Sequence, residues 1–94
     1  MSEVLVVARV AASLEKRETV AGAIDALAHD SRREDGCVTY DVFVSPNDPS
    51  DFLIFEVWSS DAALKLHGQT AHIASFKAVV QGCATIEVQK LKRV

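Results

Sequence analysis

The sequence has few of the residues that mark disulfide-rich, linker-rich or low-complexity chains. Its 94 residues include two cysteines, Cys37 and Cys83, and two prolines. Two cysteines that form no Cys-x-x-Cys pair indicate free thiols in a reducing compartment. Both prolines fall in the turn-dense segment 46–51, whose length suits a hairpin loop.

Excess positive charge and long apolar runs are also missing. Ten basic and thirteen acidic side chains give a net charge of −3, which argues against a nucleic-acid partner. The apolar run 4–10 is interrupted by Arg9 and has neither the length of a membrane span nor the flanks of a signal peptide. The sequence therefore predicts a cytoplasmic protein with no nucleic-acid or membrane partner.

The motifs of nucleotide-dependent and serine-dependent enzymes are absent too. The chain has no Gly-rich phosphate loop, dinucleotide fingerprint or Ser-centred nucleophile elbow. Any oxidation chemistry would proceed without a tightly bound nucleotide. What the chain does have is a hydrophobic fraction of 49%, which predicts one packed domain over residues 1–94 and favours oligomerisation.

Hydrophobic periodicity predicts a β-α-β-β-α-β order. Strands are expected at residues 4–12, 37–45, 52–58 and 83–91, with helical segments after the first and third strands. This order is the split βαβ arrangement of ferredoxin-like α+β domains, with a four-stranded antiparallel sheet and helices on one face. The usual strand order 4-1-3-2 would separate Cys37 and Cys83 by roughly 14 Å, too far for a disulfide.

Capping residues predict where the helices begin and end. Ser13 is expected to cap the first helix, and Gly36 to mark its end. Ser59 or Ser60 would cap a second helix that weakens at Gly68. Thr70 would cap a further segment over residues 71–81, which Gly82 ends.

The second and third strands have apolar side chains on both faces. Alternation places Val38, Tyr40, Val42 and Val44 on one face of the second strand, and Cys37, Thr39, Asp41 and Phe43 on the other. Helices can cover only one face of the sheet. We therefore expect a second copy of the chain to cover the other face.

The segment 52–61 and the histidines after it contain the densest group of chemically useful side chains. Glu56 and Trp58 share a strand face. Glu56 is interpreted either as an acid, base or anchor in a pocket, or as the partner of Arg9, His67 or a backbone amide. Trp58 and Tyr40 are each either ligand contacts or core residues.

His67 and His72 are the candidate proton-transfer groups. On one continuous helix they would diverge by about 140°, although a break at residues 68–70 could bring them together. No third ligand at suitable spacing is visible, so no metal site is predicted. One neutral imidazole facing a cleft would act as a base or hydrogen-bond donor. His29 is expected at the surface.

Several short motifs stand in a specific order along the chain. They are the segment 34–41 (EDGCVTYD), Asp48-Pro49, the strand from Phe52 through Glu56-Val57-Trp58-Ser59, Ala63-Leu64, His67, Thr70, His72 and Phe76. Together they resemble the antibiotic biosynthesis monooxygenase superfamily. The resemblance implies a ferredoxin-like protomer that pairs into a dimeric α+β barrel. It also implies a cleft between sheet and helices lined by Trp58, His67, His72 and Phe76.

The resemblance implies three kinds of chemistry. Members include cofactor-independent oxygenases of phenols or quinols, an isomerase of a phosphorylated autoinducer, and haem-degrading enzymes. Haem degradation is disfavoured, because Ala8 and His67 stand where that branch has asparagine and tryptophan. An arginine used by the polyketide-oxidising members has no identified counterpart in this chain. The small quinol-monooxygenase-like and isomerase-like branch is the nearer match.

We therefore expect a homodimeric enzyme that needs no cofactor or metal and oxidises a quinol-like or phenolic substrate with molecular oxygen. His72 or His67 would remove the phenolic proton, and Glu56 would orient an imidazole. Trp58, Tyr40 and Phe76 would bind the ring. The alternatives are a non-oxidative isomerase of a small hydroxyketone, with Arg9 or Lys65 near any phosphate, and a non-catalytic stress-response module that binds a ligand.

Overall fold

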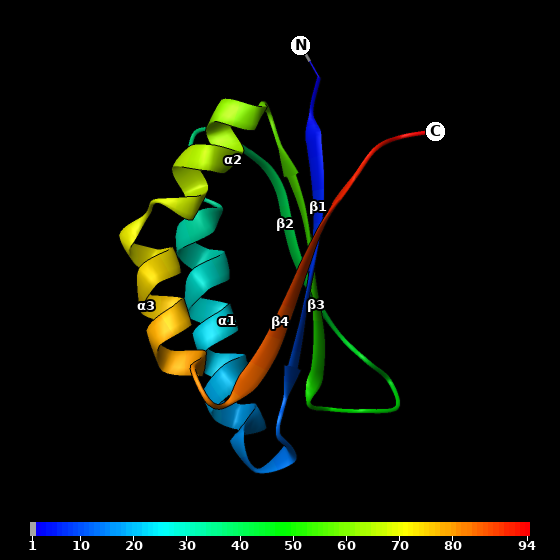
Figure 1. The fold of residues 1–94 in the computed structure, drawn as a ribbon, viewed down its shortest axis with the longest axis vertical. Coiled ribbons are helices and arrows are strands. Elements are labelled where there is room, and N and C mark those ends of the chain that lie inside the picture. Colours follow the sequence, from blue (N-terminus) through cyan, green and yellow to red (C-terminus); the bar gives the residue numbers. More distant parts are fainter. Residues whose placement is uncertain (1) are drawn as a thin grey trace.

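The computed structural model describes residues 2–94 as one antiparallel sheet with helices on a single face (Figure 1). The elements, in chain order, are β1 (Val4–Ala12), the 3-10 turn η1 (Leu14–Lys16), α1 (Arg17–Ser31), β2 (Cys37–Val44), β3 (Asp51–Trp58), α2 (Asp61–Gly68), α3 (Ala71–Val80) and β4 (Ala84–Leu91). The predicted ferredoxin-like fold is confirmed. No helix in residues 2–94 has the length and apolar character needed to cross a bilayer.

The sheet has the order β2-β3-β1-β4, with every neighbouring pair antiparallel. This confirms the predicted order and places β2 and β4 at opposite edges. Cys37 and Cys83 are both free thiols, as expected.

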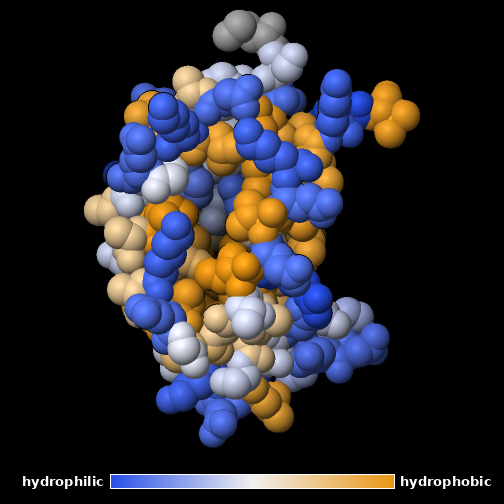
Figure 2. All heavy atoms as spheres, in the orientation of Figure 1, coloured by the Kyte–Doolittle hydropathy of each residue, from blue (hydrophilic) through white to orange (hydrophobic). Residues whose placement is uncertain are grey.

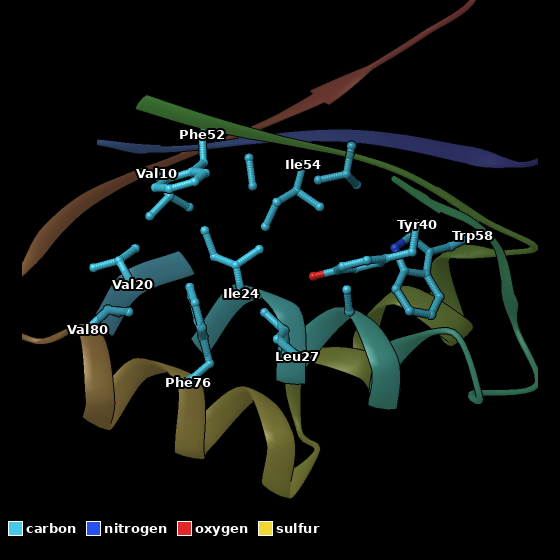
Figure 3. Close-up of a cluster of buried hydrophobic side chains, with 13 residues drawn as sticks. Val10, Val20, Ile24, Leu27, Tyr40, Phe52, Ile54, Trp58, Phe76 and Val80 are labelled. Atoms are coloured by element: carbon cyan, nitrogen blue, oxygen red, sulfur yellow. The ribbon is translucent and has the colours of Figure 1, made fainter. Parts of the chain in front are cut away.

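The core lies between the sheet and the layer formed by α1 and α3 (Figure 3). Alternate residues of β1 and β3 point toward the helices, and the helices return apolar side chains at helical spacing. The core residues with at most 3% exposure from these elements are Val6, Val10, Val20, Ile24, Leu27, Ala28, Ile54, Trp58 and Val80.

The opposite face of the sheet has no helix over it. On this outer face, Phe43 is 53% exposed and Leu53 is 38% exposed, and Val7 and Phe55 are half-buried. Arg9 also lies there and forms an ion pair with Asp51 at 3.0 Å. The prediction that β2 and β3 carry apolar residues on both faces is therefore confirmed.

A β-bulge changes the start of β2. Cys37 pairs with Trp58 and Thr39 pairs with Val57, so Val38 is an extra residue. The predicted alternation holds from Tyr40 onward. It is wrong at Cys37, which shares the helix-covered face with Trp58, and at Val38, which is 54% exposed.

The predicted caps of α2 and α3 are confirmed, and that of α1 is not. Ser60 Oγ accepts a hydrogen bond from the backbone N–H of Ala63 at 3.1 Å, and Gly82 has a φ of 77° after α3. Ser13 instead precedes η1 and makes no side-chain cap bond, so α1 begins only at Arg17.

Gly36 has a different role from the predicted end of the first helix. The helix α1 ends at Ser31, and Gly36 follows five residues later, where the chain passes against α2. A Cβ at Gly36 would overlap the Cβ of Ala63 and lie 3.2 Å from Ser59 Oγ. The backbone N–H of Ser59 also donates to Gly36 O at 2.9 Å. Glycine is required here because the two segments approach closely.

Gly36→Ala is expected to destabilise the protein by about 1–3 kcal/mol, because overpacking forces the backbone at α2 to shift. Gly22→Ala is the matched control, since it lies within α1 with no atom within 4 Å of the added Cβ. It should stabilise by up to about 1 kcal/mol. Urea denaturation of both variants measures the difference. Equal stabilities would contradict the close approach.

Candidate active site

Three separate segments of the chain converge on the carboxylate of Glu34. This residue lies between α1 and β2, while His67 lies near the end of α2 and His72 in the first turn of α3. Glu34 Oε2 is 2.7 Å from His67 Nδ1 and also 2.7 Å from His72 Nε2. The break between α2 and α3 therefore does bring the two imidazoles together.

Thr70 holds the turn that makes this convergence possible. Its hydroxyl donates to the backbone carbonyl of His67 at 2.8 Å and accepts from the backbone N–H of Ile73 at 3.3 Å. One side chain thus caps α3 and fixes the last turn of α2. The relative position of His67 and His72 depends on this residue.

His67 is held on several sides. Its residue is 5% exposed, and its ring packs against the Trp58 ring with centroids 4.3 Å apart and planes inclined by 34°. The edge of Tyr40 lies at a centroid distance of 5.9 Å. In the neutral tautomer that donates its Nδ1 proton to Glu34, the lone pair of His67 is on Nε2. That nitrogen is 4.0 Å from Glu56 Oε1.

Glu56 and Trp58 are joined within β3. Trp58 Nε1 donates to Glu56 Oε1 at 2.9 Å, as side chains two apart on one strand face allow. Burial raises the pKa of the Glu56 carboxyl, and the Trp58 hydrogen bond and His67 oppose this rise. Of the partners considered from the sequence, His67 is near Glu56, while Arg9 lies on the other face of the sheet.

Tyr40 is a protonated, buried side chain beside Glu56. It is 3% exposed, and burial followed by the nearby Glu56 carboxylate raises the pKa of its phenol far above the ordinary value. Its ring meets Trp58 edge-on, with centroids 6.4 Å apart (Figure 3). Tyr40 therefore contributes an apolar ring and a hydroxyl that stays neutral.

A cavity of about 180 Å³ lies between the sheet and the α2–α3 layer. Figure 2 shows this face of the molecule hollowed, with apolar atoms around the opening. The polar side chains in its lining are Tyr40, Glu56, His67 and Lys77. The apolar lining comes from Val6, Ala8, Val10, Leu27, Ile54, Leu64, Ile73, Phe76, Ile86 and Val88.

The two histidines border different spaces. His67 lines the cavity, whereas His72 lines a groove of about 310 Å³ between α1 and α3. Of the predicted substrate contacts, Tyr40 and Phe76 line the cavity. Trp58 is fully buried behind Glu56 and is not part of the cavity lining defined by residues 2–94. Glu34 connects the cavity side to the groove side.

Glu34 is the functional residue that the sequence reasoning did not assign. It stands in the charged stretch 30–35, where a carboxylate is normally solvated. The one signal was its place at the start of the segment 34–41. Its contacts with His67 and His72 span 33 and 38 residues, which no local spacing rule detects.

Comparison with known proteins identifies the family. The model of the family described as antibiotic biosynthesis monooxygenase matches residues 3–79. The chain belongs to the antibiotic biosynthesis monooxygenase family. It is 38% identical over 64 residues to YcnE of Bacillus subtilis, a protein named as a candidate monooxygenase, covering 68% of this chain and 67% of YcnE.

Solved structures agree with this antibiotic biosynthesis monooxygenase assignment. Rv0793 of Mycobacterium tuberculosis, also named as a candidate monooxygenase, is 33% identical over 79 residues, covering 84% of this chain and 77% of Rv0793. Its structure matches with a TM-score of 0.91 over 99% of this chain and 96% of that one, at 29% identity. PA3566 of Pseudomonas aeruginosa matches with a TM-score of 0.94 at 27% identity, covering 100% and 96% of the two chains.

Glu56→Gln is expected to stabilise the protein more at pH 8 than at pH 5. The raised pKa means that Glu56 favours folding below its ordinary pKa and loses this contribution as pH rises through the folded-state value. Glutamine keeps an acceptor for Trp58 without a charge to bury. Thermal denaturation across this range measures the effect, with the exposed Glu87→Gln as control. A stability difference that shrinks with rising pH would contradict the assignment.

Proposed function

We propose that this protein is a cofactor-independent monooxygenase that oxidises a quinol-like or phenolic substrate with molecular oxygen. The observation that carries the proposal is a cavity with an imidazole in its wall, whose Nδ1 lies 2.7 Å from Glu34 Oε2. With the Nδ1 proton on that hydrogen bond, the free nitrogen of His67 is Nε2. A positioned base of this kind can remove a phenolic proton. The family assignment supports the same class of reaction.

The size of the cavity favours a substrate with a single ring. Its volume is about 180 Å³. An apolar cavity of about 150 Å³ is known to accommodate benzene. Phe76 and Tyr40 provide aromatic wall surface for such a ring. A polycyclic substrate would extend past Ile86 and Val88 at the β4 side of the opening.

The reaction needs no outside reductant. His67 Nε2 takes the phenolic proton, the phenolate gives one electron to oxygen, and the two radicals join in a C–O bond. The O–O bond then breaks as the ring C–H proton leaves and its electron pair forms a carbonyl. The distal oxygen leaves as water with that proton and the one from His67. Phenol and oxygen thus become quinone and water, and the protein's task is deprotonation and orientation.

The remaining site residues support this step. Glu34 fixes the tautomer of His67, and His72 holds Glu34 through the other 2.7 Å contact. Glu56 lies near Nε2 and stabilises the imidazolium once the proton has moved. Trp58 holds Glu56 and stacks on His67, so it acts behind the cavity wall. His72 and Trp58 are thus positioning residues in this proposal.

The isomerase alternative would use the same imidazole without oxygen. A phosphorylated substrate would need cations, and Arg9 and Lys65 do not line the cavity defined by residues 2–94. Lys77 of α3 does line it, but the carboxylate of Glu56 also lines it, from β3. This charge balance favours a neutral substrate, and hence the phenol or quinol. A protein that only binds such a ligand would have the same charge balance, so the activity test must distinguish binding from catalysis.

His67→Gln is expected to lower the rate of oxygen uptake by about 10²–10⁴-fold, because glutamine cannot accept the proton. An oxygen electrode and quinone absorbance would follow metal-stripped protein with single-ring hydroquinones and phenols. His29→Gln, an exposed histidine of α1, is the control and should keep the wild-type rate.

An anaerobic arm separates the candidate functions. The proposal requires product only with oxygen, with one oxygen consumed per quinone formed. Turnover of a hydroxyketone without oxygen would support the isomerase instead. Ligand binding without turnover, unchanged in His67→Gln, would favour the binding module.

We further propose that a second copy of the chain covers the outer face of the sheet. The exposed apolar residues Phe43 and Leu53 are continuous there with Val7 and Phe55. A contiguous apolar face of this kind on a small domain is typical of a self-complementary interface. The interface lies on the face opposite the cavity.

Leu53→Glu is expected to convert the dimer to a monomer, because each interface would then bury two new carboxylates, and the Arg9 opposite each is already paired with Asp51. Light scattering after size-exclusion chromatography measures the mass. Leu66→Glu is the control, since Leu66 is 65% exposed on α2, away from the outer face. A wild-type monomer, or a Leu53→Glu dimer, would contradict the proposal.

A further inference from the structure

The cluster of Glu34, His67 and His72 has the donor set of a transition-metal site. One oxygen and two imidazole nitrogens, each from a different structural segment, lie within 4.8 Å of one another. Two imidazoles and one carboxylate are a ligand set used for Zn²⁺, with a further position left open. No metal site was predicted from the sequence, because Glu34 lies more than thirty residues from His67 and His72 along the chain.

The charges around the cluster also suit a cation. His67 faces a carboxylate from each of its nitrogens, Glu34 at 2.7 Å and Glu56 at 4.0 Å. In the part of the chain that the structure describes, the ion pairs of these two glutamates are with histidines alone. A divalent ion would neutralise the negative charge of both carboxylates, whereas a neutral imidazole adds no positive charge.

The three donor atoms would have to rearrange to hold an ion. Metal–ligand distances near 2.0–2.2 Å place tetrahedral donors roughly 3.3–3.5 Å apart. Glu34 Oε2 is now 2.7 Å from each nitrogen, so it would withdraw by less than ~1 Å. The two nitrogens lie within 4.8 Å of each other, so they would approach by up to about 1.5 Å. All three side chains are partly buried, which limits competition from water.

Glu56 would complete the site as an outer partner. Imidazoles that bind a metal usually donate their other N–H to a carboxylate or carbonyl. With a metal on Nδ1 of His67, the remaining proton is on Nε2, the nitrogen nearest Glu56. Glu56 is itself fixed by the indole of Trp58 at 2.9 Å.

We propose that Glu34, His67 and His72 form a binding site for a divalent transition-metal ion, with Zn²⁺ as the best-fitting common ion. The metal site itself does not depend on the proposed oxygenase, whereas its effect on the reaction rests on that function. A metal on Nδ1 leaves His67 Nε2 protonated, so in the bound state this imidazole cannot accept the phenolic proton. Metal binding and deprotonation by His67 therefore exclude each other, and Zn²⁺ would inhibit the proposed oxidation.

The test measures metal binding directly on the full chain without a histidine tag. Metal-stripped protein competes with a chromophoric chelator for Zn²⁺, and Co²⁺ absorption reports the geometry. We expect one ion per chain, with a visible spectrum typical of low coordination number. Glu34→Gln and His72→Gln should each weaken binding by more than about 100-fold, and Glu56→Gln by about 10-fold.

His29→Gln is the matched control, because it removes a histidine outside the cluster and should bind as wild type does. Near-ultraviolet circular dichroism confirms that each variant is folded. Wild-type protein that binds no Zn²⁺, or binding unchanged in folded Glu34→Gln and His72→Gln, overturns the metal site. These readouts do not involve oxygen uptake, so a failed oxygenase assay leaves them interpretable.

Discussion

The arrangement of the site depends on one carboxylate oxygen that contacts two imidazoles. Glu34 Oε2 links the turn before β2 to both α2 and α3. The link is possible because Gly36, two residues later, lets this turn pass directly against Ala63. A larger residue there would push α2 away and lengthen the Glu34–His67 contact. Backbone packing and site geometry are therefore set by the same close approach.

The fold follows from patterns that the sequence shows directly. The strands at 4–12 and 52–58, the Ser60 and Thr70 caps and the helix end at Gly82 each depend on a few neighbouring residues, and each is found as predicted. The bulge at Val38 could not be predicted, because Val38, Tyr40, Val42 and Val44 fit an uninterrupted alternation and nothing local shows that Val38 is the extra residue. The role of Gly36 could not be predicted either, because it depends on where α2 packs.

The site was predictable to the extent that its contacts are local. The period of a strand places Glu56 beside Trp58, and the helix break places His67 near His72. Arg9 alternates with Ala8 and Val10 and therefore lies on the outer face, so strand periodicity alone is enough to exclude an ion pair between Arg9 and Glu56. Glu34 and the burial of Trp58 behind the cavity depend on packing between distant segments.

In the two proposals made for this site, the chemistry depends on what occupies Nδ1 of His67. A proton there, held by Glu34, leaves Nε2 as an acceptor beside the cavity. A metal there forces the proton to Nε2, and the same ring becomes a donor toward Glu56. The residues of the cavity wall stay the same, yet the basic imidazole nitrogen would be gained or lost. His72 contacts the same Glu34 oxygen from the groove side, so this one carboxylate lies between the groove and the cavity.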